Sequence, residues 1–276
     1  MVKVKYKKKG LLCICSNWFS AGNKEIISKC DLAFYFALPK LPSGYNKNIL
    51  IRDAFTLITD LTCSEEELMD KIHSATKYKI RRAKKDGVTS AVFDSEYISK
   101  NPSVLDEFAQ LYDQFLKSKK LSGKCDLPLL KACVAGGNLV IICARFNDQN
   151  LVYHVYITDG TATRLHYSSS LFREVDDDLK TIIGRANRLL HWTGITLFKD
   201  RGYKVYDWGG YSKRKDLKNI NLLKDGFGGT KLAVFHICVP CSFLGSTLIF
   251  GFRMIAKACY FINKIVYIKF CQIDFR

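Results

Sequence analysis

The chain has 276 residues, of which 48% are hydrophobic and 25% are charged, and it contains only five prolines. This share of apolar residues is enough for a packed core and excludes a disordered or low-complexity protein. Lys and Arg number 43 and Asp and Glu number 26, so the formal net charge is +17. Such a charge indicates an anionic partner, and nucleic acid, a nucleotide-bearing substrate and an anionic membrane surface all meet that requirement.

The eleven cysteines are scattered along the chain, and their number is odd. This is not the pattern of a disulfide-rich secreted protein, and the apolar stretch at 10–15 is too short for the core of a secretory signal. We therefore expect a cytoplasmic protein with reduced thiols. Cys238 and Cys241 have the CxxC spacing, with His236 nearby, but one such pair is at most half of a zinc site. We expect no metal, and we interpret these cysteines as small packing residues.

The first 48 residues form a basic segment with five lysines among its first nine positions. An alternating, β-branched run over 53–59 then predicts a strand. Ser64 and Glu67 have the spacing of a capping box, which predicts one helix beginning there and ending before Gly87. A strong apolar stripe over 103–116 predicts a second helix.

The hydrophobic pattern then changes from helical to alternating. Three β-rich runs, at 138–145, 151–158 and 161–168, are separated by turns short enough to predict an antiparallel meander. Three aspartates then open a third helix, predicted over 176–198. A short strand at 203–206 follows, then an amphipathic or looped stretch, and then a last strand at 231–239. This order predicts an α+β fold with a mixed, mostly antiparallel sheet flanked by helices.

The C-terminal segment is distinct, because the 21 residues from Leu232 to Phe252 include no charged side chain. Basic residues set among apolar ones follow it. A helix from about Phe243 that is apolar first and basic later is typical of a helix lying in the membrane interface. A buried packing helix and a membrane span are the alternatives, and Pro240 argues against a span.

Three segments together carry a family pattern: YKIRRAKKDG at 78–87, GYKVYDWGG at 202–210 and LKDGFGG at 223–229. They resemble the Fem-type (FemABX) branch of the GNAT acyltransferase superfamily, in which a basic helix precedes a Tyr-Asp-Phe-Gly-Gly motif and a Phe-Lys-x-x-Phe-Gly motif. Trp208 and Leu223 each replace a phenylalanine of that pattern. Fem-type peptidyltransferases usually carry two GNAT-like units, whereas this chain has room for a single-unit form.

The resemblance implies a GNAT-like domain over 49–240, preceded by the basic extension at 1–48 and followed by the C-terminal helix at 241–276. It implies acyl transfer from an acyl-CoA to an amine, or to a hydroxyl, of a cell-envelope or polysaccharide precursor. The enzyme would be held peripherally at the inner membrane face by its basic surface and tail. One alternative is aminoacyl-tRNA-dependent transfer of the peptidoglycan type, the only case in which we expect nucleic acid. Another is a catalytically inactive GNAT fold that serves as a scaffold at the membrane.

Lys224 matches the lysine that stabilises charge on the reacting carbonyl in the Fem pattern, and its alternative role is that of a surface lysine before a glycine-rich turn. Candidates for moving protons are Asp207, Tyr167 and His191. Their alternatives are a turn cap, a strand end and a satisfied structural histidine. The glycine-rich segments are expected to contact substrate through Trp208, Gly209, Gly210, Phe227 and Gly228.

The donor pyrophosphate is expected on backbone N–H groups at a helix start, the arrangement that GNAT enzymes use. The candidate segment is 183–188, where Gly184 would allow close approach and polar or basic side chains surround it, namely Arg185, Asn187 and Arg188. This hypothesis requires a loop, and it fails if the helix that begins near 176 continues through Gly184. The basic run from Lys77 to Lys85 suits a membrane surface or a nucleotide substrate, or else it is a solvated helix face.

Overall fold

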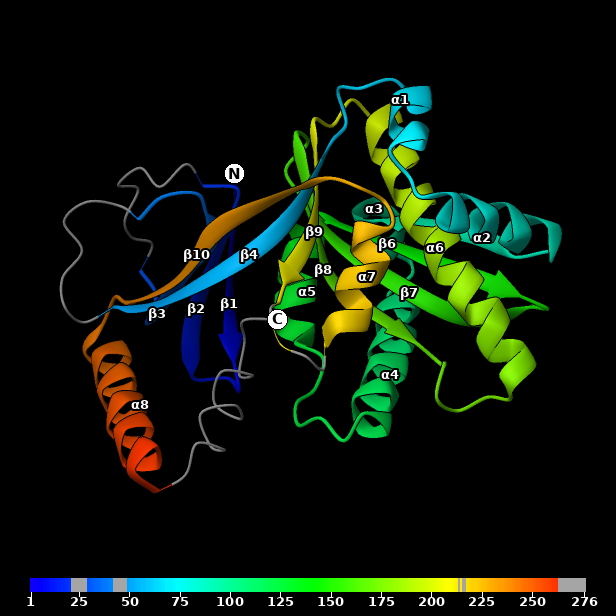
Figure 1. Cartoon of the computed structure of the whole chain (residues 1–276). Coiled ribbons are helices and arrows are strands. Elements are labelled where there is room, and N and C mark those ends of the chain that lie inside the picture. The colour runs from blue at the N-terminus through cyan, green and yellow to red at the C-terminus, as the bar shows by residue number, and fades with distance from the viewer. Residues whose placement is uncertain (21–28, 42–48, 213, 215–216, 263–276) are drawn as a thin grey trace. The chain divides into compact units, whose positions relative to one another are not determined.

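The computed structural model describes residues 1–20, 29–41, 49–212, 214 and 217–262, with side chains up to Ala256. These residues form two compact units (Figure 1). Unit 1 comprises Met1–Ala54, Asp126–Ala132 and Ala233–Arg276, and unit 2 comprises Phe55–Cys125 and Cys133–Leu232. Strands β4 (Leu50–Asp60) and β10 (Thr230–Pro240) and helix α5 (Leu127–Ala135) contribute residues to both units.

Unit 1 is built on strands β1 (Val2–Lys8), β2 (Leu12–Trp18), β3 (Leu32–Leu38) and β10, in the order β1-β2-β3-β10. The first pair and the last pair are antiparallel, and β2 and β3 are parallel. The sequence analysis predicts no strand within 1–48. In β1, however, Val2 and Val4 are buried while Lys3 and Lys5 are exposed, which is the alternation of a half-buried strand at a charged sheet edge.

Helix α8 (Phe243–Ile262) begins where the sequence predicts a helix and belongs to unit 1. Its Ile249 is buried in a cluster with Leu32 and Cys238. Among the described residues, strands β1 to β3 and helix α8 lie in the same unit, because β3 pairs with β10 and α8 follows β10 directly. Within the described residues, no helix combines the length and apolar character needed to cross a membrane.

Unit 2 contains the strand order β4-β9-β8-β7-β6-β5. The predicted meander is confirmed, because β6 (Leu139–Phe146), β7 (Gln149–Thr158) and β8 (Ala162–Ser170) pair as antiparallel neighbours. Strand β5 (Thr89–Asp94), for which the sequence analysis has no strand, extends this sheet antiparallel to β6. Strand β9 (Val205–Tyr211) pairs antiparallel with β4 and parallel with β8. The predicted α+β class with a mostly antiparallel sheet is confirmed.

Helices cover both faces of this sheet (Figure 1). Because side chains alternate along β7, Tyr156 packs with Tyr206 on the α6 (Asp177–Asp200) side, while Tyr153 meets Phe108 of α4 (Ser103–Ser118) on the other. Helix α2 (Ser74–Lys85) packs against α6, and the short α3 (Ser95–Lys100) packs beside α4. The predicted helices at 103–116 and 176–198 are confirmed as α4 and α6.

The capping box at Ser64 is present, but the helix that it opens, α1 (Glu65–Asp70), is short. The prediction of one continuous helix to Gly87 is wrong at this point. The backbone N–H of His73 donates to the carbonyl of Gly226, and α2 begins at Ser74. A backbone contact from a distant part of the chain, which the local pattern cannot reveal, therefore accompanies the break.

Candidate active site

Strands β8 and β9 pair with each other at only three positions, the last of which joins Arg164 to Asp207. Over the remaining described residues of these strands, β8 follows β7 to Ser170 and β9 follows β4 to Tyr211. The edge of β9 that faced β8 is therefore released from pairing after Asp207. We call residues 208–210 the open edge of β9.

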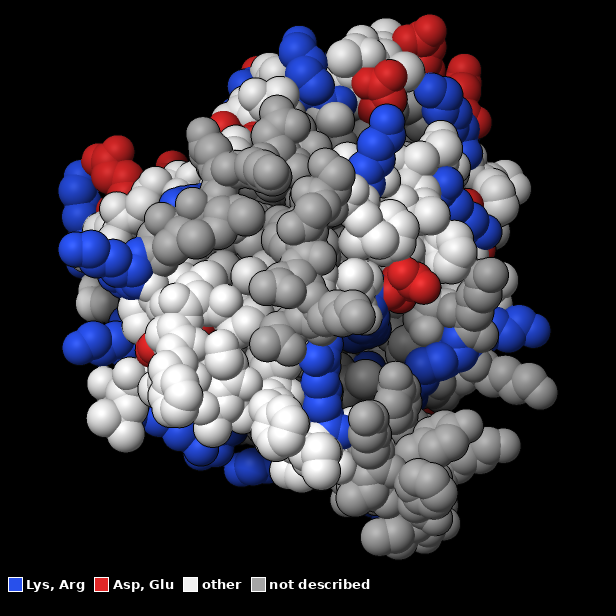
Figure 2. Space-filling view, turned by 90° about the vertical axis from the view of Figure 1, so that its left-hand side faces the viewer, with Lys and Arg blue, Asp and Glu red and all other residues white. Residues whose placement is uncertain are grey.

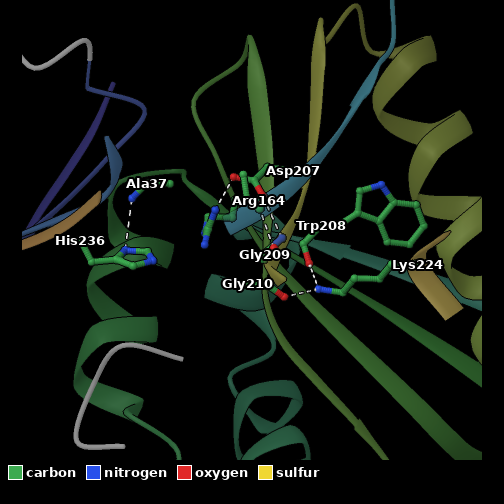
Figure 3. Close-up of polar contacts among 9 residues, drawn as sticks. Ala37, Arg164, Asp207, Trp208, Gly209, Gly210, Lys224 and His236 are labelled. Atoms are coloured by element: carbon green, nitrogen blue, oxygen red, sulfur yellow. Dashed lines mark hydrogen bonds and ion pairs between the residues drawn. The ribbon is translucent and has the colours of Figure 1, made fainter. Parts of the chain in front are cut away.

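Lys224, in α7 (Lys218–Asp225), has its ammonium group at this open edge (Figure 3). Its Nζ donates to the carbonyls of Trp208 and Gly210, at 2.7 Å each. The intervening carbonyl, that of Gly209, instead accepts from Thr56 of β4, so successive carbonyls are used on opposite sides of the strand. Lys224 is only 6% exposed, and burial lowers its pKa to about 8.

A buried ion pair lies beside this lysine (Figure 3). Arg164 donates to one oxygen of Asp207, and the other oxygen accepts from the backbone N–H of Gly209 at 2.8 Å. This second oxygen also shares the single O–H of Thr56 with the carbonyl of Gly209. The side chains of Arg164 and Asp207 are 8% and 7% exposed. Because three donors already occupy this carboxylate, Asp207 holds β4, β8 and β9 together at the point where β8 and β9 stop pairing.

Gly209 lies just beyond the paired part of β8 and β9, with its α-carbon close to the backbone of β8. Its φ is +73°, and an added Cβ would lie 2.7 Å from the carbonyl oxygen of Leu165. We expect Gly209→Ala to lower the free energy of unfolding by about 2 kcal/mol or more, because both the backbone angle and the contact become strained. Gly210→Ala is the matched control, since no atom lies within 4 Å of its added Cβ. Urea denaturation compares the two, and equal losses would contradict this role for Gly209.

Four buried polar side chains and the half-buried Asn187 form a continuous hydrogen-bonded chain on the α6 face of the sheet. His154 Nε2 lies 2.8 Å from Asn187 Oδ1, and its Nδ1 lies 3.1 Å from the Tyr156 hydroxyl. The Tyr156 hydroxyl lies 3.0 Å from that of Tyr206, which in turn lies 3.2 Å from His191 Nδ1. The amide oxygen of Asn187 can only accept, so His154 Nε2–H donates to it and His154 Nδ1 accepts from Tyr156. Tyr206 then donates to Tyr156, and His191 Nδ1–H donates to Tyr206.

This polarity leaves the Nε2 atom of His191 as the basic end of the chain. The His191 ring packs against Trp208, with ring centroids 4.7 Å apart, and against Phe227, at 5.6 Å. Burial and the nearby His154 hold the pKa of His191 well below its ordinary value. The imidazole is therefore neutral near pH 7 and lies next to the residue whose carbonyl binds Lys224.

The buried histidines make stability depend on pH. Burial lowers the pKa of His154 to about 4, against 6.5 for an ordinary histidine. A histidine whose pKa is lowered by folding supports the fold above its unfolded pKa, and this support is lost progressively as pH falls from the unfolded pKa to the folded pKa. We expect the free energy of unfolding to fall by about 2–3 kcal/mol from pH 7.5 to pH 4.5 through His154 alone. Urea titrations check this, and a His154→Gln variant with the same pH dependence would contradict it.

The predicted donor-binding segment is a helix and not a loop. Gly184 lies in the interior of α6, so the backbone cradle expected at 183–188 is wrong, because N–H groups inside a helix are bonded to its own carbonyls. Asn187 is engaged by His154. Arg188 donates to the Gly184 carbonyl at 2.7 Å, and Arg185 pairs with Asp86 at 2.6 Å.

Arg185 and Arg188 nevertheless lie near a third basic side chain, Lys79 of α2. The charge of Arg188, together with burial and the charge of Arg185, lowers the pKa of Lys79. We call Lys79, Arg185 and Arg188 the cation cluster. Within the described residues, Asp86 is the carboxylate paired with it, through Arg185.

Other candidate residues lie elsewhere. Tyr167 packs against Phe108 and Tyr112 of α4, with ring centroids 5.8 and 4.7 Å away, on the face opposite α6. Gly228 has φ +74°, and an added Cβ there would lie 3.1 Å from the carbonyl of Lys71. The lack of a side chain at Gly228 therefore lets the backbone pass close to Lys71, at the end of α1.

The CxxC segment lies in unit 1. His236 Nδ1 accepts from the backbone N–H of Ala37 at 3.2 Å (Figure 3). Cys238 is buried, and the Cys241 thiol lies 3.5 Å from the Val239 carbonyl. Among the residues with described placement, no group of three or more His, Cys, Asp or Glu side chains is arranged to hold a metal ion.

The structure therefore brings Lys224, Asp207, Trp208 and Gly210 together, with His191 and Phe227 packed around Trp208. Sequence reasoning missed the residues that support them, which are Thr56, His154, Tyr156, Arg164 and Tyr206. Arg164 could have been recognised as a candidate, because it is a charged residue within an otherwise β-rich run. Tyr206 lies inside the second quoted motif. His154 and Tyr156 alternate within an apolar strand, and nothing local distinguishes them from other core residues.

No sequence-family model matches the chain, and no curated protein matches it. Among solved structures, the fold is similar to that of FemX, at 13% identity with a TM-score of 0.56, over 85% of this chain and 83% of that one. It is also similar to the C-terminal domain of a putative lysylphosphatidylglycerol synthetase from Agrobacterium fabrum, at 11% identity with a TM-score of 0.52, over 79% of this chain and 70% of that one. These likenesses concern the fold.

Proposed function

We propose that this chain, which has the Fem-like GNAT fold, is a transferase that passes an acyl or aminoacyl group to an amine or a hydroxyl. The observation that carries the proposal is the buried ammonium of Lys224 at the open edge of β9. Two of its three N–H groups are used by the carbonyls of Trp208 and Gly210. The third has no acceptor among the described residues and is available to a substrate oxygen.

Attack of an amine on an ester or thioester carbonyl places negative charge on the carbonyl oxygen. A fixed cation in a site shielded from water stabilises that charge far more than it would in solution. Lys224 meets this requirement, because the two carbonyls fix its position and its side chain is buried. Its pKa of about 8 keeps it mostly protonated at neutral pH.

The attacking amine must also lose a proton. We assign this role to His191, whose neutral imidazole ends the buried hydrogen-bonded chain. Tyr206, Tyr156 and His154 would hold its ring orientation and tautomer through their successive hydrogen bonds. Asp207 is assigned a positioning role, and Tyr167 is not required in this proposal.

The residues at the start of α6 decide whether coenzyme A fits as the donor. Helix α6, which follows β8, begins with Asp176 as its N-cap, and the Asp176 side chain accepts from the Leu179 N–H. Asp177 and Asp178 add two further negative charges in the first turn. A helix start with this composition disfavours a pyrophosphate, so it does not fit the usual cradle for coenzyme A. The cation cluster is the remaining place in unit 2 that we propose for phosphate groups.

The three aspartates favour the alternative donor, an aminoacyl-tRNA. Its phosphates do not have to bind at the start of α6. The cation cluster and the exposed basic side chains of α2 would then contact the RNA backbone. For the acceptor we propose an amine- or hydroxyl-bearing precursor of the cell envelope. The likeness to a domain named for lysylphosphatidylglycerol synthesis supports a lipid headgroup as one such acceptor.

Native mass spectrometry of the purified chain with acyl-CoAs and with charged tRNAs distinguishes the two donors. We expect the unaltered chain to retain one of the two kinds of donor. A Lys79→Gln/Arg188→Gln variant should no longer retain it. The matched control is Lys117→Gln/Lys124→Gln, which removes the same charge from two exposed positions of unit 2 outside α2 and the cation cluster. Retention of neither donor at millimolar concentration would contradict the proposal and leave a non-catalytic scaffold as the better account.

A further inference from the structure

One face of helix α8 is apolar and exposed, although the opposite face is firmly packed. Six large apolar side chains recur at intervals of four and seven positions, which places them on one face. Phe243 is 89% exposed and Phe250 is 65% exposed. The full set is Phe243, Leu244, Leu248, Phe250, Met254 and Ile255. We call it the α8 outer face.

Several contacts fix the orientation of this helix on the sheet of unit 1. Ile249 is buried against Leu32 and Cys238. Gly245 approaches the carbonyl of Asp31 so closely that an added Cβ would lie 2.0 Å from it. Arg253 donates to the carbonyl of Ile49 at 2.8 Å. The helix therefore cannot turn its outer face inward without losing these contacts.

The charge of the chain is concentrated in the unit that carries this face. Unit 1 contains 16 Lys and Arg residues and 5 Asp and Glu residues, a net charge of +11 out of +17 for the whole chain. Lys3, Lys5 and Lys7 project from β1 on its exposed side. Figure 2 shows a broad uncharged area in the lower part of the view, with Lys and Arg side chains along its margins.

We propose that the α8 outer face docks unit 1 onto an anionic membrane surface, with α8 lying in the interface between headgroups and acyl chains. Apolar side chains on a fixed helix enter this boundary, and surrounding lysines gain from anionic lipid headgroups. A second copy of the chain fits the face less well, because pairing would bring two units of charge +11 together. This inference holds whether or not the chain transfers acyl groups.

Vesicle flotation tests the proposal with the full chain. We expect binding to vesicles of phosphatidylcholine with 30% phosphatidylglycerol, roughly ten times weaker binding to phosphatidylcholine alone, and a decline with added salt. Leu248→Glu/Phe250→Glu should weaken binding by about tenfold or more, because two apolar contacts are replaced by charges that the anionic surface repels. The matched control is Leu11→Glu/Ile51→Glu, which changes the same charge at two exposed apolar positions outside α8.

Three results would overturn the proposal. Equal losses in the two double variants would show a general charge effect and not a role of the α8 outer face. A dimer in sedimentation velocity that Leu248→Glu/Phe250→Glu dissociates would assign the face to a second copy. A large loss of stability in that variant without lipid, together with no vesicle binding by the unaltered chain, would mean that residues 263–276 or another segment of the chain covers the face.

Discussion

Replacing Lys224 by methionine should lower the rate constant of transfer by about 10²- to 10³-fold, the usual effect of removing one donor that stabilises a developing oxyanion. Methionine keeps the length of the side chain and its apolar stem but removes the charge. The carbonyls of Trp208 and Gly210 lose their donor, so a loss of stability of about 1–3 kcal/mol is also expected. Steady-state kinetics with the donor that the chain retains measures the first effect, and urea denaturation measures the second.

Lys218→Met is the matched control, because Lys218 lies at an exposed position of the same helix. We expect that variant to retain its rate and its stability. Lys224→Arg keeps the charge, but its planar guanidinium is too large for the space between the carbonyls of Trp208 and Gly210. This variant should therefore retain little activity. Unchanged transfer by folded Lys224→Met would exclude the role assigned to Lys224.

The second large effect concerns the buried ion pair. Asp207→Ala should lower the free energy of unfolding by about 3–5 kcal/mol, because it leaves the guanidinium of Arg164 buried without its partner. The N–H of Gly209 loses its acceptor as well, and the hydroxyl of Thr56 keeps only the carbonyl of Gly209. The matched control is Glu96→Ala, which removes one member of an exposed pair with Lys100 and should change stability little.

The activity of the Asp207 variants separates positioning from direct proton transfer. If Asp207 only positions β8 and β9, the activity of Asp207→Asn should follow its folded fraction and keep its pH profile. Loss of transfer in a variant that is fully folded, together with loss of one limb of the pH profile, would instead mean that Asp207 moves protons itself.

Elements with a strong local pattern could be predicted from the sequence. The meander over 138–168 and helices α4 and α6 each combine a clear period with turn or cap residues at their ends. The first three strands were not predicted. In β1, valine alternates with lysine, so the run lacks the apolar character of a core strand, although it pairs with the neighbouring β2. Strand β3 also pairs with β10, which lies far away in sequence. The break between α1 and α2 involves Gly226, which lies far away in sequence.

The candidate site was predictable where one motif holds several of its members. Asp207, Trp208, Gly209 and Gly210 are consecutive, and Lys224 follows in the next motif. The expected phosphate loop at Gly184 was not found, because a glycine is tolerated inside a long helix whose other residues favour the helical conformation. The partner of Asp207, Arg164, lies on another strand, and only the pairing of β8 with β9 brings the two together.

The most direct test of the central claim, that Lys224 acts as a cation, is the pH dependence of the transfer rate of the unaltered chain divided by that of Lys224→Met. This ratio cancels the ionisation of the acceptor, which both proteins share. Because the pKa of Lys224 is about 8, the ratio should be constant below that pH and fall about tenfold per unit above it. A ratio that rises through pH 8 would mean that the neutral amine acts as a base, and a ratio near one at every pH would mean that Lys224 takes no part.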